Sequence, residues 1–252
     1  MSFGSLGFGQ NSPFAVSTAD VGLGAGVILS AGIGELIQRR VEPFKQVEIS
    51  ALDPQDINRF DRPFAGKWNL SAKKWSDGLA IGLMASPLAM FVMPNERRDF
   101  LRIAMMGAEA GLLSYGLVGM GKGIAQRPRP LLYGSDAPLD VQMRKDARRS
   151  FFSGHTAFTA TALFYGASVF DAYHPYSRWR PLVWGGAIGG SALVGYLRMR
   201  AGKHFPTDVI VGYIIGLNAG ALIPWLHKRA NVKGRVLAFS FSGNAAGFNL
   251  SF

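Results

Sequence analysis

Three short polar clusters contain the side chains of this chain that are suited to chemistry. They lie at residues 122–130, 153–155 and 198–208, and each borders an apolar stretch. Together they supply at least three cations, two histidines and one carboxylate, which are the groups needed to transfer a phosphoryl group without a metal. Since all three border apolar segments, we expect their polar groups to converge at one end of a helical bundle. The pattern therefore predicts an active site.

The cations of these clusters suit a phosphoryl group, whose transition state spreads negative charge over its equatorial oxygens. The candidates are Lys122, Arg129 and Arg198. An arginine grips two oxygens with its planar fork, whereas a lysine acts as a point charge. Arg127 and Arg200 compete for the same roles, and a single arginine is more often a solvated surface charge.

The two histidines suit nucleophilic attack and proton transfer. His204 and Asp208 are four residues apart, so both side chains lie on one face if a helix begins near Phe205 or Pro206. The carboxylate then accepts the imidazole N–H, fixes its tautomer and makes the other ring nitrogen a better nucleophile. An unperturbed pKa of about 6.5 suits His155 to acid and base catalysis. A lone histidine is more often structural, but two at these spacings are not well explained that way.

The dipeptide Ser153-Gly154 precedes an apolar helix that we expect to begin near His155. The serine can cap this helix while exposed N–H groups point at an anion. Glycine lets a phosphate approach the backbone closely. Ser153 as a nucleophile is the alternative, but capping together with phosphate binding is the preferred role.

The order and spacing of the clusters resemble those of the type 2 phosphatidic acid phosphatase and vanadium haloperoxidase superfamily. The family pattern is K-x6-RP, then PSGH, then SR-x5-H-x3-D. Its three parts match Lys122 to Pro130, Ser153 to His155 and Arg198 to Asp208, and the resemblance covers roughly residues 100–226. Phe152 stands where the family has proline, and Leu197 stands where it has serine. We expect these departures to change loop geometry and substrate preference more than activity.

The resemblance implies a metal-independent phosphatase that acts on a lipid phosphate or diphosphate and needs no cofactor. It makes His204 the nucleophile that forms a phosphohistidine, His155 the general acid and base, and Asp208 the residue that orients His204. The implied phosphate-binding residues are Lys122, Arg129, Ser153, Gly154 and Arg198.

Two alternatives remain. Haloperoxidases hold vanadate in the same geometry, so a vanadium-dependent oxidase is one alternative, although apolar segments favour a lipid substrate. A non-catalytic phospholipid-binding protein is the other, and the departures at Phe152 and Leu197 favour it. The lipid itself stays open among phosphatidic acid, phosphatidylglycerol phosphate, undecaprenyl diphosphate and lipid A.

Composition narrows the partners. The formal charge of +11 and the pI near 10.2 suit an anionic partner such as phosphate, an acidic membrane surface or nucleic acid. Nucleic acid is not favoured, because 48% of the residues are hydrophobic and no nucleic-acid-binding motif stands out. With no cysteine and only four histidines, two of them in the clusters, we expect no disulfide framework and no metal site. The oligomeric state stays open.

Six apolar segments are long enough for helices and lack the strict alternation of strands. They are Val21 to Ile37, Gly78 to Met93, Ile103 to Gly121, Thr156 to Phe170, Pro181 to Leu197 and Val209 to Leu226. We expect an all-α, six-helix transmembrane bundle with the active site at one end. The charge-free runs, about 12 to 18 residues, are shorter than the ~20 that cross a bilayer. Buried helices of a soluble protein are therefore the alternative.

Glycines recur at four-residue intervals in the last two segments, which lets helix backbones approach closely. The repeats are Gly185 with Gly189, Gly186 with Gly190, and Gly212 with Gly216 and Gly220. Glu109 lies within the third segment, where an ionisable group needs a partner. We expect that partner to be Arg102 or a cation beneath the site. His174 and His227 are expected in loops at helix ends, without a function.

No linker rich in proline, glycine or serine divides the 252 residues, so we expect one domain. Its parts are an N-terminal extension (1–20), a loop at the water–lipid boundary (38–77), the catalytic core (100–226) and a tail (236–252). The tail alternates apolar and small residues around Ser242-Gly243-Asn244. This pattern predicts a β-hairpin, which is too small to close a barrel.

Two indications of membrane orientation disagree. Phe60-Asp61-Arg62 and Ser71 to Asp77 resemble a bacterial branch of the family, which implies a multi-pass protein of the bacterial inner membrane with its site facing the periplasm. However, 18 of the 27 Lys and Arg residues lie in the loops on the cluster side. The positive-inside rule would place that side in the cytoplasm. We keep the outward-facing site on the basis of the resemblance.

Overall fold

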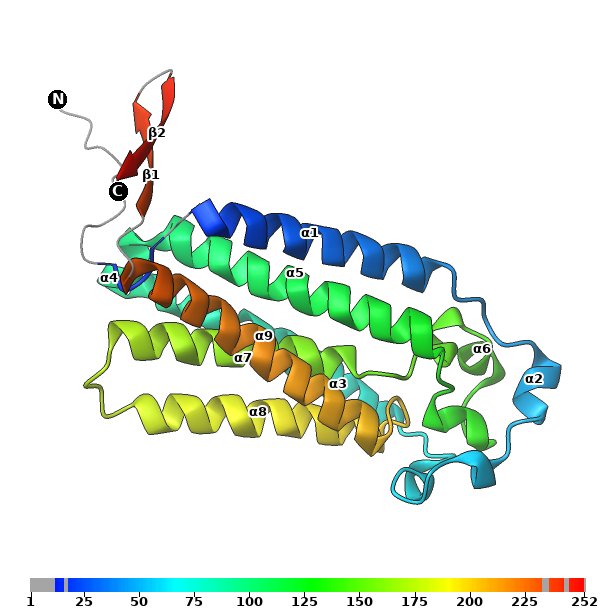
Figure 1. Cartoon of the computed structure of the whole chain (residues 1–252). Coiled ribbons are helices and arrows are strands. Elements are labelled where there is room, and N and C mark those ends of the chain that lie inside the picture. The colour runs from blue at the N-terminus through cyan, green and yellow to red at the C-terminus, as the bar shows by residue number, and fades with distance from the viewer. Residues whose placement is uncertain (1–11, 16–17, 233–235, 243–244, 252) are drawn as a thin grey trace.

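Long helices that lie side by side dominate the structure (Figure 1). The computed structural model describes residues 12–15, 18–232, 236–242 and 245–251, so most of the predicted N-terminal extension lies outside it. The long helices are α1 (Thr18–Arg39), α3 (Leu70–Ala85), α5 (Phe100–Ala125), α7 (Gly154–Tyr173), α8 (Arg180–Arg200) and α9 (Pro206–Val232). The predicted helical class is confirmed.

The predicted count of six helices is wrong, because the described residues contain nine α-helices. The additional three are short and lie in the connections: α2 (Gln46–Ser50), α4 (Pro94–Arg98) and α6 (Leu139–Gln142). Local chemistry starts them. The Glu48 carboxylate accepts the N–H of Lys45 at 2.7 Å before α2, and Pro94, with its fixed φ, is the first residue of α4. Helices of four or five residues are too short to show an apolar periodicity in the sequence.

The helix α3 begins and ends earlier than predicted. The Asn69 side chain accepts the N–H of Ala72 at 2.8 Å and caps the helix. The helix ends at Ala85, and the chain continues as the 3-10 helix η3 (Ser86–Val92), since Pro87 has no N–H to extend an α-helix. Asp77 therefore lies inside α3 and not in a loop.

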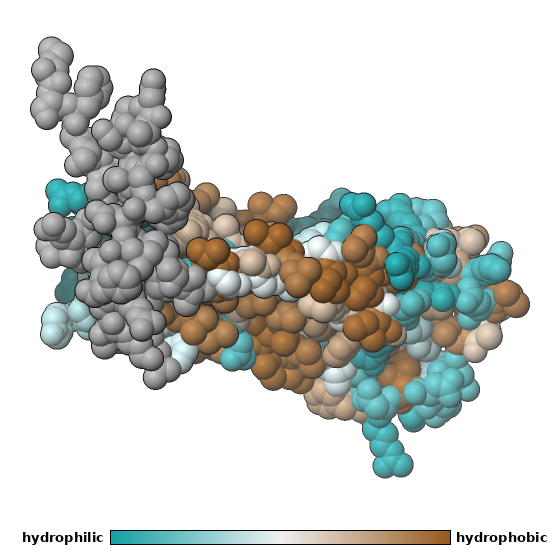
Figure 2. Space-filling model, turned by 45° about the horizontal axis from the view of Figure 1, so that its top comes forward, coloured by the Kyte–Doolittle hydropathy of each residue, from teal (hydrophilic) through white to brown (hydrophobic). Residues whose placement is uncertain are grey.

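Within the described ranges of the chain, four segments are long and apolar enough to cross a membrane, where six spans are predicted from the sequence. They are Asp20–Arg39, Leu70–Val92, Phe100–Tyr133 and Pro206–Lys228. Large apolar side chains on these segments are exposed, including Ile28, Ile81 and Ile124. Figure 2 shows apolar surface along the middle of the molecule and hydrophilic surface at the end that carries α2 and α6. Such a surface is typical of a membrane protein.

The helix α7 is central and packs against α3, α5, α8 and α9. Its contact with α9 is close, because a Cβ at Gly212, Gly216 or Gly220 would lie 2.2 to 2.6 Å from a backbone oxygen of α7 or its N-cap residue. The glycine repeat predicted to allow close approach in the last segment is therefore confirmed. In α8 only Gly190 fits that prediction, since a Cβ there would lie 3.1 Å from Leu163 of α7 and 3.2 Å from Leu83 of α3, whereas Gly185, Gly186 and Gly189 face open space.

The buried Glu109 has a different partner from the two expected. Its carboxylate lies 2.9 Å from Nε2 of His227, and His227 is fully buried within α9 and not in a loop. His174 caps the end of α7 and lies 2.6 Å from Glu96. Both histidines thus contact buried acids away from the three clusters.

The polar end of the bundle is built by the connections between helices. A separate apolar cluster there includes Phe44, Leu131 and Leu132. Gly202, between α8 and α9, has φ +68°, and a Cβ there would lie 1.7 Å from the carbonyl oxygen of Lys67. Only glycine allows this contact, which docks residues 62–69 against the third cluster.

Two strands, β1 (Val236–Ser242) and β2 (Ala245–Ser251), pair antiparallel. Phe239 lies opposite Phe248 in their register. These are the two arms for which the sequence predicts a hairpin. Gly243 and Asn244 of the predicted turn lie outside the described residues.

Candidate active site

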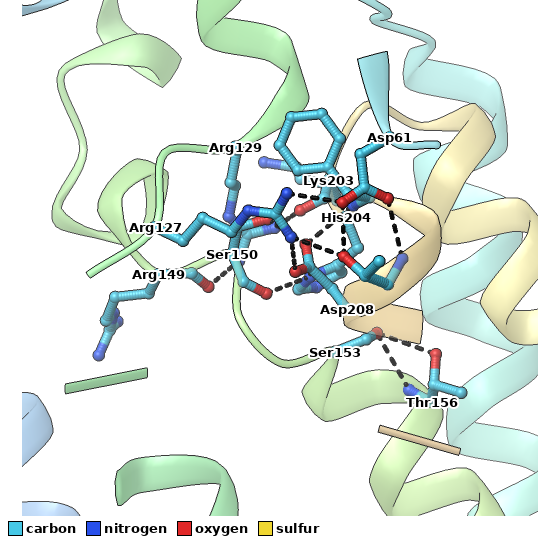
Figure 3. Close-up of polar contacts among 12 residues, drawn as sticks. Asp61, Arg127, Arg129, Arg149, Ser150, Ser153, Thr156, Lys203, His204 and Asp208 are labelled. Atoms are coloured by element: carbon cyan, nitrogen blue, oxygen red, sulfur yellow. Dashed lines mark hydrogen bonds and ion pairs between the residues drawn. The ribbon is translucent and has the colours of Figure 1, made fainter. Parts of the chain in front are cut away.

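The three polar clusters meet at one end of the bundle. Arg129 of the first cluster donates to the carbonyl of Lys203 in the third at 3.0 Å. The N–H of Ser153 in the second donates to the carbonyl of Asp208 in the third, also at 3.0 Å. Figure 3 shows residues of the first and third clusters in one network of polar contacts, with Ser153 of the second cluster and its partner Thr156 beside it. Hydrogen bonds to backbone carbonyls, between segments far apart in the sequence, therefore fix the geometry.

Arg129 is almost fully buried and holds the surrounding loops. Its guanidinium donates to the backbone and the carboxylate of Asp146, both at 2.7 Å, as well as to Lys203. A guanidinium has five N–H donors, so these bonds leave capacity for a phosphate oxygen. Arg129 can thus both organise the site and contribute charge to it.

The other two predicted cations have more unused capacity. Arg198 is 3% exposed and uses one nitrogen, which donates to Asp77 at 2.7 Å and to Ser76 at 3.2 Å. Its Nε has no hydrogen-bond partner in the part of the chain that the structure describes. Within the same residues the Lys122 ammonium makes no hydrogen bond or ion pair, and a Cβ at Gly154 would lie 3.3 Å from it. A buried arginine with unused donors next to a lysine that makes no ion pair favours an anion as ligand.

His204 is buried, and its hydrogen bond differs from the predicted one. Nδ1 lies 2.7 Å from the carbonyl oxygen of Ser150. That oxygen can only accept, so the proton is on Nδ1 and Nε2 keeps its lone pair. The carboxylate of Asp208 is 3.8 Å from Nδ1, too far for a hydrogen bond. The expected direct bond between His204 and Asp208 is therefore corrected to a bond to Ser150.

Asp208 acts on His204 through its neighbours. Its Oδ2 accepts the hydroxyl of Ser150 at 2.6 Å and the N–H of Phe205 at 2.8 Å. The second bond caps α9, which begins at Pro206 as predicted. Asp208 thereby fixes the residues on both sides of the imidazole.

Arg127, which the sequence also allowed as a phosphate-binding residue, instead pairs with two carboxylates. It donates to Asp208 at 2.6 Å and to Asp61 at 2.7 Å, and its guanidinium lies over the Phe205 ring (Figure 3). Asp61 also accepts the N–H and the hydroxyl of Thr207. Burial alone would raise the pKa of Asp61, but the hydrogen bonds from Arg127 and Thr207 lower it. Arg127 therefore neutralises two buried carboxylates.

The second competing arginine, Arg200, lies outside the site. It is exposed at the end of α8, and its guanidinium donates to the hydroxyl of Tyr196 at 3.0 Å. Arg198, two residues earlier, is buried among the clusters. Of the two arginines, only Arg198 lies among the clusters.

Ser153 caps α7, as predicted. Its side chain accepts the N–H of Thr156 at 3.5 Å and hydrogen-bonds to the Thr156 hydroxyl at 2.9 Å. These contacts hold the hydroxyl against the helix. The first N–H groups of α7, at Gly154 and His155, precede any partner within the helix and can face an anion.

His155 is the more accessible of the two histidines, and its partner is a residue that the clusters do not contain. Its side chain is 39% exposed, and Nε2 lies 3.2 Å from the carboxylate of Asp77 on α3. Burial and the charge of Arg198 lower the pKa of His155 to about 3, although Asp77 opposes the shift. His155 is therefore neutral in the free protein and needs an added anion to hold a proton at neutral pH.

The surroundings of His204 are cationic. Burial, together with the charges of Arg129 and Arg198, lowers the pKa of His204 well below its usual value. Burial and Arg129 also lower the pKa of the adjacent Lys203 to about 8. Burial alone would raise the pKa of Asp146, but the charges of Arg129 and of the nearby lysines have a larger effect and lower it below its usual value. The Asp146 carboxylate therefore stays ionised. The arrangement can bind a phosphate dianion next to a neutral imidazole.

Several residues of the site are not among the catalytic and phosphate-binding residues predicted from the sequence. They are Asp61, Asp77, Asp146, Ser150 and Lys203. Lys203 adjoins His204 and Ser150 lies three residues before Ser153, so a search around the motifs would have found both. The three acids lie in connections or on α3, and only the folded chain brings them to the clusters.

Comparison with known proteins agrees with this geometry. The family model of the PAP2 superfamily matches residues 104–231, just over half of the chain. Comparison with curated proteins and with solved structures gave no match. The matched residues include all three clusters, and the family suggests a phosphatase-type activity. The chain therefore belongs to the PAP2 superfamily, that of the type 2 phosphatidic acid phosphatases.

Proposed function

We propose that this protein is a metal-independent phosphatase that hydrolyses a lipid phosphate or diphosphate through a phosphohistidine. The observation that carries the proposal is the state of His204, a buried neutral imidazole whose Nδ1 proton is held by Ser150. This leaves the Nε2 lone pair for attack on phosphorus. Burial, followed by the charges of Arg129, Arg198 and Lys122, lowers the pKa of His204, and the same cations would attract a phosphate dianion.

In the first step, Nε2 of His204 attacks phosphorus, and the bond from phosphorus to the lipid oxygen breaks. A proton from His155 Nε2 goes to that oxygen as it leaves. The bound phosphate dianion supplies the negative charge that favours protonated His155. Lys122, Arg129 and Arg198 stabilise the charge on the equatorial oxygens, and the first N–H groups of α7 assist.

In the second step, the phosphohistidine is hydrolysed. The now neutral His155 takes a proton from water, and the water oxygen attacks phosphorus. The bond from phosphorus to Nε2 of His204 breaks, which releases inorganic phosphate and restores the neutral imidazole. Asp208 keeps His204 in place throughout by holding Ser150 and the N–H of Phe205.

An apolar cavity in the bundle supports a lipid substrate. It has a volume of about 460 Å³ and lies between η3, α5 and α7. No charged side chain lines it, and its walls include Phe91, Phe100 and Tyr165. Phe158, also in its wall, follows His155 by three residues on α7. An acyl or prenyl chain in this cavity would place a phosphate headgroup at the polar end.

We further propose a multi-pass location in a bacterial inner membrane, with the site facing the periplasm. The four candidate spans support a membrane location. The orientation rests on the family resemblance, and the distribution of Lys and Arg opposes it.

The proposal is tested by phosphate release from a panel of lipid phosphates and diphosphates, with detergent-purified protein in EDTA. We expect release by the wild type and a loss of at least about a thousandfold in His204→Ala, because the nucleophile is removed. Arg198→Ala should lose about a hundredfold or more. Arg200→Ala is the matched control, since this arginine is exposed two residues away, and it should keep wild-type turnover.

Two outcomes would overturn the proposal. Undiminished turnover in a folded His204→Ala variant would exclude the phosphohistidine. An absence of phosphate release from every lipid would exclude the phosphatase. Oxidation of halide by the vanadate-loaded protein with hydrogen peroxide would then identify the alternative activity.

A further inference from the structure

A carboxylate from outside the three clusters lies inside the site. Oδ1 of Asp77, on α3, is 2.7 Å from Arg198 NH1 and 3.2 Å from His155 Nε2. Its Oδ2 accepts from the Lys73 ammonium at 2.7 Å. One oxygen therefore bridges the arginine assigned to phosphate and the histidine assigned to proton transfer. Asp77 also precedes residue 104, where the family match begins.

The charges around His155 show what Asp77 contributes. The titratable and charged groups that face the His155 imidazole lie on α3, on α5 and the loop after it, on α8 and on the segment before α9. They are Asp77 with Lys73 behind it, Lys122, Arg129, Arg198 and His204. Asp77 is the carboxylate among these groups, whereas Lys73, Lys122, Arg129 and Arg198 are cations. Without it, the cations would oppose the protonated imidazole that must donate to the leaving oxygen.

The same contact orients Arg198. The bond to Asp77 uses one terminal nitrogen of the guanidinium, whereas Nε has no partner among the described residues. A guanidinium fixed at one nitrogen loses little entropy when its remaining N–H groups bind a phosphate. Lys73 fixes the other oxygen of Asp77, so the carboxylate is held on both sides.

We propose that Asp77 is a positioning residue of the reaction, which holds Arg198 toward the phosphate and keeps on His155 Nε2 the proton that leaves with the lipid oxygen. This inference rests on the proposed function. Asp77 carries negative charge close to the bound phosphate, so it weakens phosphate binding while it promotes turnover. A residue that only supports the fold would not affect the two quantities in opposite directions.

The test compares wild type, Asp77→Asn, Asp77→Glu and Asp140→Asn as full-length detergent-purified proteins. Asp140 is exposed and pairs with Arg144, so Asp140→Asn gives the same change of charge away from the site. Binding of inorganic phosphate is measured by calorimetry, which needs no turnover. Hydrolysis of the lipid phosphate that the wild type prefers is measured as a function of pH.

We expect Asp77→Asn to bind inorganic phosphate about fivefold more tightly, the effect of removing one charge about 4 Å away in a water-like dielectric. Its kcat should fall about a hundredfold, since proton donation to the leaving oxygen is impaired. The alkaline limb of its kcat profile should move to lower pH by about one unit, because His155 loses its proton more readily. Asp77→Glu should recover part of kcat, and Asp140→Asn should match the wild type.

The outcomes separate this inference from the proposed function. Wild-type turnover with unchanged phosphate affinity, kcat and alkaline limb in Asp77→Asn would overturn the role of Asp77 alone. Parallel loss of phosphate binding and turnover would also overturn it and make Asp77 a scaffold for Arg198. If the wild type hydrolyses no lipid phosphate, the proposed function fails. If, in addition, Asp77→Asn binds inorganic phosphate no more tightly than the wild type, Asp77 does not act on the bound anion. If Asp77→Asn does not fold, Asp77→Glu decides through its phosphate affinity and pH profile.

Discussion

At the scale of single residues, the site works by controlling where protons are. His204 carries its proton on Nδ1 because Ser150 offers only a carbonyl oxygen there. Asp208, at 3.8 Å from the ring, pairs with Arg127 and makes no hydrogen bond to the imidazole. This arrangement keeps one ring nitrogen available for attack, and no side chain of the site has to change its charge before substrate arrives.

Burial of a neutral His204 has a consequence for stability. The pKa of His204 is lowered by burial first and then by Arg129 and Arg198, so the unfolded chain binds a proton that the folded chain excludes. Folding stability is therefore full above the unfolded pKa of about 6.5 and falls as the pH decreases below it. We expect the melting temperature of the wild type to fall between pH 7 and pH 5, as measured by thermal unfolding in detergent.

The matched variant for this prediction is His204→Asn, which removes the titrating group and keeps a hydrogen-bond donor for Ser150. Its melting temperature should depend less steeply on pH over the same range. Equal slopes in the two proteins would show that other groups dominate the acid sensitivity.

At the scale of elements, α7 joins the polar site to the apolar interior. Its N-terminus carries Ser153, Gly154 and His155, and its next two turns contribute Phe158 and Thr161 to the cavity. The helix α3 begins at the polar end, where it supplies Asp77, and η3 continues it along the cavity wall. The same helices thus hold both the proposed headgroup site and the proposed chain site.

Gly111 on α5 tests the chain site, because it lines the cavity and a Cβ there would meet no atom within 4 Å. A leucine should fit without disturbing the helix and fill part of the cavity. We expect Gly111→Leu to lower kcat/KM for a long-chain lipid phosphate about tenfold, the lower range for a misfitting apolar group in a pocket. Hydrolysis of a short-chain soluble phosphate should be unchanged.

The control for this change is Gly189→Leu on α8, which also faces open space and does not line this cavity. It should leave both substrates unaffected. If Gly111→Leu slows the short-chain and long-chain substrates equally, the cavity does not hold the lipid chain.

At the scale of the whole molecule, charge and apolar surface are segregated. The hydrophilic end with α2 and α6 adjoins a broad apolar surface (Figure 2), which fixes how the bundle would sit in a bilayer. It does not fix which end faces the cytoplasm. The Lys and Arg residues of the polar end include Arg127, which pairs with Asp61 and Asp208, and Arg129, which pairs with Asp146. The positive-inside rule counts all Lys and Arg residues in the loops, so it includes these arginines although their charges are paired with acids.

The absence of native cysteines makes the orientation directly measurable. Ser135 is exposed at the polar end, and Tyr176 is fully exposed between α7 and α8 at the opposite end. With the site facing the periplasm, a membrane-impermeant maleimide applied to spheroplasts should label Ser135→Cys and not Tyr176→Cys. Labelling of both after permeabilisation is the control, and the reverse pattern in intact spheroplasts would place the site in the cytoplasm.

The sequence by itself determined the helical class and the residues of the three clusters. Both depend on local information. Apolar runs without alternation predict helices over any long segment, and the spacing within each cluster is preserved however the chain folds. The start of α9 at Pro206 and the cap at Ser153 were predictable for the same reason, since caps depend on neighbouring residues.

Only the tertiary structure decided the partners of the charged groups. Ser150 replaced Asp208 as the partner of His204, Arg127 joined two acids that are 147 residues apart in the sequence, and Asp77 entered the site from α3. Hydrogen bonds and ion pairs act over a few ångströms, whatever the separation along the chain. The sequence contains the charged groups, but their pairing requires the packing of α3, α5, α7, α8 and α9 into one bundle.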